Sequence, residues 1–175
     1  MEIRVYFEGH RLLRTGFSDF FVELREAAHK AGSRIEFIAA KDGPSVYRKA
    51  ARTHPNAWNI LLKDSEGPHA PNAENVFYMV ELMEAWFLAD RNTLKSYYGK
   101  DFLENLIGNT ANVETVSKAD VHDRLKRATA RTANGEYEKV KHAPRLLESL
   151  NPHLVQDRAP HCKKLFDSVK AKLKA

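Results

Sequence analysis

The first third of the chain alternates short apolar segments of strand type with segments of helical periodicity. Hydrophobic side chains occupy every second position of residues 2–7, and residues 34–40 and 58–63 are also rich in the residue types that strands favour. Helical spacing of hydrophobic residues runs through 13–31, and a second helix is predicted over 46–53. The order strand, helix, strand, helix, strand favours a parallel sheet with right-handed crossovers.

The remainder of the chain is predicted to be mainly helical. Residues 76–80 are the candidate for a fourth strand of the same sheet. Helices are predicted over residues 81–98, 118–129, 135–150 and 161–173. We therefore expect one domain, residues 1–175, with an α/β core in residues 1–90 and a helical, basic extension in residues 91–175.

The composition is that of an ordinary globular protein, with 43% hydrophobic and 29% charged residues. No apolar run approaches the roughly 20 residues that cross a bilayer, and the N-terminus lacks the pattern of a secretory signal. The single cysteine, Cys162, cannot form an internal disulfide, which fits a cytoplasmic protein. The net charge of +5 is unevenly distributed, with +6 in residues 88–175 and −1 in residues 1–87, which predicts either a polyanion partner or solvated helix faces in the second half.

Acidic residues follow two of the predicted strands at their carboxyl ends. Glu8 comes directly after the first strand, and Asp64 and Glu66 come after the third. Ligands of an open parallel sheet bind beyond these ends, and carboxylates that meet there repel one another unless they are protonated or hold a cation. Carboxylate oxygens suit Mg²⁺ or Mn²⁺. The alternative interpretation is that Asp64 and Glu66 belong to an ordinary polar turn.

Several stretches resemble known proteins. The Glu8-Gly9 pair and the Asp-x-Glu at 64–66 resemble the toprim pattern of topoisomerases, primases and some nucleases. The runs LLKDSEGP, MVELMEAWFLADRNTLKSYYG, SKADVHDRLKRAT and YEKVKHAPRLLESLNP resemble a bacterial family, the domain of unknown function 4276, which is grouped with toprim-like proteins.

This resemblance covers most of the chain. It implies a toprim-like three-layer α/β fold with a mainly parallel four-stranded sheet, and it implies that Glu8, Asp64 and Glu66 are the catalytic, metal-binding triad. The chain departs from the family pattern after Glu8-Gly9, where His10 and Arg11 replace a longer Gly-rich stretch that carries an acid.

Further charged residues are candidates for the same site. Glu84 lies among apolar neighbours, where an unpaired carboxylate is costly, so it is a candidate additional acid. A basic surface for nucleic acid is predicted in the helical half, with solvated helix faces as the alternative. Its candidate residues are Lys118, Arg124, Lys126, Arg127, Lys139, Lys141 and His142.

These patterns predict a metal-dependent nuclease of toprim type that hydrolyses phosphodiester bonds with Mg²⁺ or Mn²⁺ as its cofactor. The resemblance suggests a role in bacterial defence or repair beside an ATPase partner. The alternative is a catalytically inactive, toprim-like binding subunit of a larger complex. The residues leave open whether the substrate is DNA or RNA.

Overall fold

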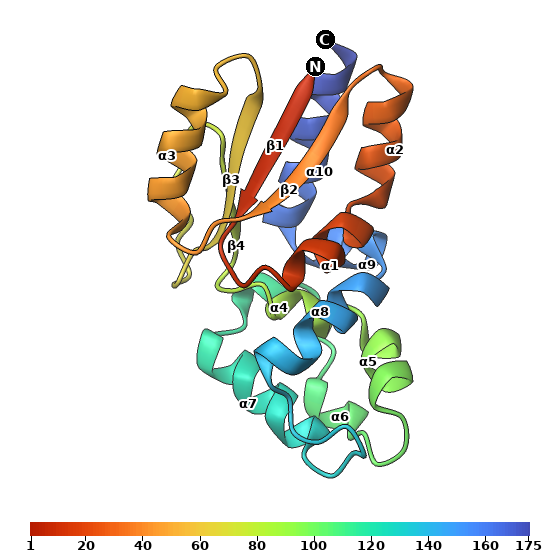
Figure 1. Cartoon of the computed structure of the whole chain (residues 1–175). Helices are drawn as coiled ribbons and strands as arrows, with labels where there is room; N and C mark the ends of the chain where they lie inside the picture. Colours follow the sequence, from red (N-terminus) through yellow and green to blue (C-terminus); the bar gives the residue numbers. More distant parts are fainter.

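Four strands form one fully parallel sheet in the order β2-β1-β3-β4 (Figure 1). The computed structural model describes all of residues 1–175. This sheet confirms the fold class that the alternation of strands and helices predicted. The strands are β1 (Glu2–Phe7), β2 (Arg34–Ala39), β3 (Trp58–Asp64) and β4 (Val76–Met79).

Helices cover both faces of the sheet, which gives a three-layer α/β arrangement (Figure 1). On one face of the sheet, helix α3 packs against β1 and β3. On the opposite face, α1 and α2 pack against β2, and α10 packs against β4. Because side chains alternate along a strand, Phe7 enters the large core while Tyr6 enters the smaller cluster beneath α3. The covering helices are α3 (Gly43–Thr53), α1 (Leu13–Phe20), α2 (Val22–Lys30) and α10 (Pro160–Lys174).

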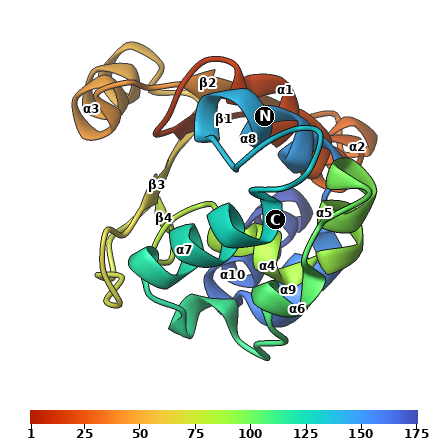
Figure 2. The same cartoon turned by 90° about the horizontal axis from the view of Figure 1, so that it is seen from below.

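The other helices gather at the carboxyl ends of the strands. Seen from this end, α5, α7 and α8 surround the lower edge of the sheet (Figure 2). Helix α8 packs closely along α1, so a helix of the second half lies directly beside the first helix of the chain. The elements of this group are α4 (Ala85–Ala89), α5 (Arg91–Tyr98), α6 (Glu104–Ile107), the short 3₁₀ helix η1 (Val113–Thr115), α7 (Lys118–Thr129), α8 (Lys139–Ser149) and α9 (Pro152–Arg158).

Capping residues divide one predicted helix and begin another that was not predicted. The helix predicted over 81–98 is divided at Asp90, whose backbone is not helical and whose carboxylate accepts from the Thr93 amide at 3.1 Å. Pro152 stands at the start of α9, a helix that was not predicted, and its missing N–H has no cost at that position. The Asn151 side chain caps α9 by accepting from the His153 amide at 3.0 Å.

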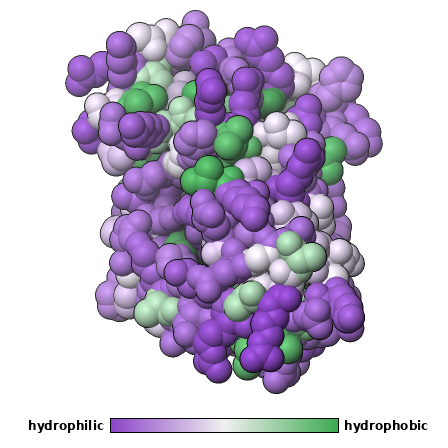
Figure 3. Space-filling model, turned by 60° about the horizontal axis from the view of Figure 1, so that its bottom comes forward, coloured by the Kyte–Doolittle hydropathy of each residue, from purple (hydrophilic) through white to green (hydrophobic).

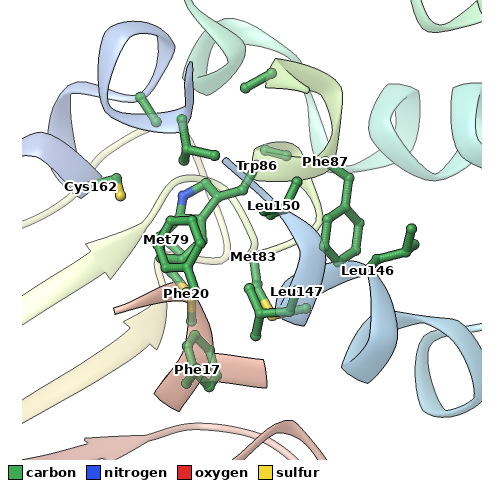
Figure 4. Close-up of a cluster of buried hydrophobic side chains, with 14 of the residues drawn as sticks. Phe17, Phe20, Met79, Met83, Trp86, Phe87, Leu146, Leu147, Leu150 and Cys162 are labelled. Atoms are coloured by element: carbon green, nitrogen blue, oxygen red, sulfur yellow. The ribbon is translucent and has the colours of Figure 1, made fainter. Parts of the chain in front are cut away.

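Trp86 lies at the centre of the main hydrophobic core (Figure 4). Its ring is fully buried and stacks on Phe20, with ring centroids 5.0 Å apart. Met83 and Leu147 lie nearby in the same cluster, which extends from β1 to α10. The core therefore joins the sheet to the C-terminal helices. None of the helices combines the length and the apolar character that crossing a membrane would require.

The close approach of α1 and α8 predicts that Gly16→Ala destabilises the protein. A Cβ at position 16 would lie 2.9 Å from the Pro144 carbonyl oxygen and 3.0 Å from Leu147 Cβ, which is too close. We expect a loss of roughly 1–3 kcal/mol in the free energy of unfolding, measured by urea denaturation. Gly67→Ala is the control, because nothing lies within 4 Å of its added Cβ. Equal stability of the two variants would contradict this packing.

Candidate active site

A cavity of about 560 Å³ lies at the carboxyl end of β3, between the sheet and the helices of the second half. Asp64 and Glu84 border it on the side of the sheet. Positively charged or titratable side chains from α7 and α8 also line the cavity. Those side chains are Lys118, His122, Lys126 and Lys139.

Asp64 is the last residue of β3 and points to the same face of the sheet as Leu62. Its Oδ1 accepts from the Met83 amide at 2.8 Å, and its Oδ2 lies 3.7 Å from Lys139 Nζ. The pKa of Asp64 is raised to about 7, chiefly by burial and in smaller part by the negative charge of Glu84, while the Lys139 ammonium opposes the rise. The carboxyl group is therefore poised to exchange a proton or a cation near neutral pH.

Glu84 is a deeply buried carboxylate that shares its cation with Asp64. The residue is only 1% exposed and lies just before α4. Its Oε2 accepts from Lys139 Nζ at 3.2 Å, and its Oε1 lies 4.0 Å from His122 Nε2. A buried charge needs such partners, since its desolvation is otherwise strongly unfavourable. The structure thus brings Glu84, the candidate additional acid, together with Asp64.

Glu66 lies at the rim of the cavity and pairs with Lys118. Lys118 begins α7, and its amide donates to Glu81 Oε2 at 2.8 Å. Ser117 caps this helix by accepting from the Asp120 amide at 3.1 Å. The cap and the Glu81 contact together hold the start of α7 beside the loop that follows β3.

One face of α7 presents a row of side chains to the cavity. Lys118, His122 and Lys126 are four residues apart, so they lie one above another on the helix surface. Lys126 Nζ lies 3.6 Å from Glu136 Oε1, at the far end of this row. The sequence analysis did not select His122 or Glu136. The four-residue spacing from Lys118 and Lys126 was the signal that could have identified His122.

The structure does not bring Glu8 to Asp64 and Glu66. Phe7 pairs with Leu62 in the sheet, so Glu8 comes one residue later and points to the opposite face from Asp64. Its carboxylate lies against Gly43 at the start of α3, and it does not border the cavity. No group of three His, Cys, Asp or Glu side chains is arranged to hold a metal ion. Glu8 and Asp64 thus lie at the same edge of the sheet but on its opposite faces.

The remaining candidates for nucleic-acid binding do not border the cavity. Arg124 NH1 donates to the Ile107 carbonyl at 3.2 Å, which ties α7 to α6. Arg127 is exposed and pairs with Asp123 one turn earlier, at 3.0 Å. Lys141 donates to the Asn134 carbonyl at 3.0 Å. These three side chains make local contacts that account for their positions.

His142 is buried among aromatic rings and belongs to the core. Its Nδ1 accepts from the Glu138 amide at 3.0 Å, and its Nε2 lies 3.2 Å from the Asn134 carbonyl oxygen. Burial lowers the pKa of His142, and these contacts fit a neutral ring that is protonated at Nε2. The structure therefore places His142 away from the predicted nucleic-acid surface, because one side of α8 packs inward.

A comparison with known protein families shows the family to which the chain belongs. The model of the family described as "Domain of unknown function (DUF4276)" matches residues 61–170, which is more than half of the chain. The chain therefore belongs to this family, as the resemblance predicted. The matched segment contains Asp64, Glu66, Glu84 and the row on α7, whereas Glu8 lies outside it. No curated protein and no solved structure matches the chain.

The raised pKa of Asp64 predicts how stability depends on pH. Its pKa is about 7 in the folded protein against an ordinary value of 3.8, so the buried charge destabilises the fold above pH 7 and has no such effect below pH 4. Asp64→Asn removes this charge. We expect the variant to be more stable than the wild type at pH 8, by up to about 4 kcal/mol, and the difference to vanish as the pH falls to 4.

Urea denaturation at pH 4, 6 and 8 measures this difference. Asp167→Asn is the control, since Asp167 is an exposed residue of α10 that pairs only with Lys163 one turn away. A variant Asp64→Asn that is less stable than the wild type at pH 8 would show that Lys139 outweighs the cost of burial.

Proposed function

We propose that this member of the DUF4276 family is a metal-dependent nuclease of toprim type, which hydrolyses phosphodiester bonds in DNA or RNA. The observation that carries the proposal is the convergence of the buried Glu84 and the largely buried Asp64 on one ammonium group, beside a cavity that Lys118, His122 and Lys126 of α7 also line. The cavity lies beyond the carboxyl end of a parallel strand, where α/β proteins bind their ligands.

The acids at this site fit Mg²⁺ or Mn²⁺ held by two carboxylates. Mg²⁺ in phosphoryl-transfer sites is commonly bound by one or two carboxylates, with water and substrate phosphate as its other ligands. Lys139 Nζ lies within 4 Å of both Asp64 and Glu84, so the space between the two acids already accommodates a positive charge. Glu66 at the rim would contribute through water. This ligand set replaces the Glu8, Asp64 and Glu66 triad that the resemblance implied.

The side chains around the cavity supply the other requirements of phosphodiester hydrolysis. The bound cation would lower the pKa of a water molecule and stabilise charge that develops on the phosphate. Lys139 is close enough to the acids to bind an oxygen of the same phosphate once that phosphate enters. Lys118 and Lys126, at the two ends of the row on α7, would hold the flanking phosphates. By analogy with toprim nucleases, we propose a cytoplasmic role in bacterial defence or repair with an ATPase partner.

A catalytically inactive binding subunit is the second candidate. Two observations favour it: the Lys139 ammonium already occupies the position between the two acids, and Glu8 lies on the other face of the sheet. Such a subunit would use the same cationic row to hold a polyanion without cleaving it. The two candidates therefore differ in metal binding and in turnover.

Removal of either buried acid should abolish cleavage. We expect the wild type to cut plasmid DNA or an RNA transcript with Mg²⁺ or Mn²⁺, and Asp64→Asn or Glu84→Gln to reduce the rate at least about 100-fold, because each loses a metal ligand. Isothermal titration with Mn²⁺ should show heat for the wild type and none for the two variants. Asp167→Asn is the matched control and should behave as the wild type. A wild type that neither binds Mn²⁺ nor cuts would favour the inactive subunit.

Lys126 and Arg127 are neighbours that should respond differently to substitution. Lys126 borders the cavity, whereas Arg127 is paired on the helix surface. For oligonucleotide binding without metal, Lys126→Ala should reduce the slope of log Kd against log salt concentration by about one, the effect of losing one phosphate contact. Arg127→Ala should leave the slope unchanged. An equal effect of both substitutions would show that the cations act as a diffuse surface charge and not through the cavity.

A further inference from the structure

A small apolar patch is exposed directly beside the candidate active site. Leu12 is 50% exposed and Val140 is 54% exposed, and they are two of the five large hydrophobic residues exposed on the protein. Both border a pocket of about 80 Å³ that His10, Pro144 and Lys139 also line. Figure 3 views the molecule toward the end that carries the site, and it shows a few hydrophobic side chains near the middle of a largely hydrophilic face. At the patch itself, the side chains of Leu12, Val140 and Pro144 are accompanied by the polar side chains of His10 and Lys139.

Local structure does not account for either hydrophobic residue. Leu12 occupies the N-cap of α1, where Ser, Thr, Asp or Asn would stabilise the helix, and its side chain makes no capping bond. Val140 lies in the first turn of α8, where an exposed β-branched residue is less favourable than Ala, Lys or Glu. Neither belongs to a hydrophobic core cluster. A bound molecule would account for both.

Lys139 connects the patch to the acids. It borders the pocket at the patch, and its ammonium also contacts Asp64 and Glu84 in the larger cavity. A phosphate at Lys139 would therefore place the adjoining nucleoside within reach of Leu12 and Val140. His10 contributes an exposed imidazole, held in place because its Nδ1 accepts from the Leu12 amide at 3.3 Å. Imidazole rings and apolar side chains are surfaces on which unstacked bases lie.

We propose that His10, Leu12 and Val140 form a platform for one unpaired nucleobase, and that the substrate is accordingly single-stranded nucleic acid. The proposal rests on the proposed function, since it assigns the phosphate next to that base to the site of Asp64 and Glu84. A base inside a duplex is stacked on both faces and paired along its edge, so it cannot turn onto a side-chain platform without leaving the helix. A flexible single strand presents its bases without that cost.

The test measures binding without metal or cleavage. Fluorescence anisotropy in EDTA compares the full chain with Leu12→Ser and Val140→Ser, using a labelled single-stranded oligonucleotide, its duplex, and an abasic strand of equal length and charge. We expect the wild type to bind the single strand about tenfold or more tightly than the abasic strand, within the range that base stacking contributes. Each substitution should weaken binding of the single strand several-fold and leave binding of the abasic strand unchanged. Val22→Ser on α2 is the control, because Val22 is 41% exposed and does not border either pocket.

The outcomes separate this platform from the nuclease activity. Affinities that do not distinguish the single strand from the abasic strand, or substitutions that weaken both equally, would overturn the platform and leave a partner protein as the occupant of the patch. A preference for the duplex would also overturn it. Base-dependent binding that Leu12→Ser reduces would support the platform even if no metal produced cleavage, in which case the nuclease proposal alone would fail. Metal-dependent cleavage together with binding that does not depend on the bases would support the nuclease proposal and overturn the platform.

Discussion

The ammonium group of Lys139 contacts two acids that the fold has largely removed from solvent, and this interaction connects the two halves of the chain. Asp64 ends a central strand of the sheet, Glu84 lies before α4, and Lys139 begins α8. Removing Lys139 would leave two carboxylates close together with little solvent, which is strongly unfavourable. The position of α8 is therefore linked electrostatically to the carboxyl end of the sheet, and the candidate site forms at that junction.

Hydrophobic packing holds the same junction in place. Helix α8 lies along α1 at a distance that Gly16 permits, and Leu147 from α8 enters the core that contains Trp86 and Phe20. These apolar contacts bring Lys139 to the acids, so packing and the ion pairs act at the same junction. A preformed scaffold of this kind suits a site whose charged groups must stay close together before any ligand arrives.

The periodicity of the sequence was sufficient to predict the four strands and the parallel sheet, because burial on both faces leaves a clear pattern in β1 and β3. The ends of the predicted strands, the apolar neighbours of Glu84, the basic helices and the family resemblance were sufficient to select several residues that border the cavity: Asp64, Glu66, Glu84, Lys118, Lys126 and Lys139. Prediction failed where side chains on one helix face different surroundings. His142 was grouped with Lys139 and Lys141 as a cationic face, yet it points into the core.

The sequence by itself determined the fold class, the acids at the ends of two strands and the excess of positive charge in the second half. Only the tertiary structure decided which of these groups meet. Glu8 and Asp64 lie at the ends of adjacent strands, but they are offset by one residue in the register. Because successive side chains of a strand point to alternate faces, this offset places the two acids on opposite faces of the sheet. Glu84 meets Asp64 instead, because the backbone amide of Met83 binds the Asp64 carboxylate and brings the residue after Met83 beside it. Such pairings depend on contacts between distant segments, which no local pattern specifies.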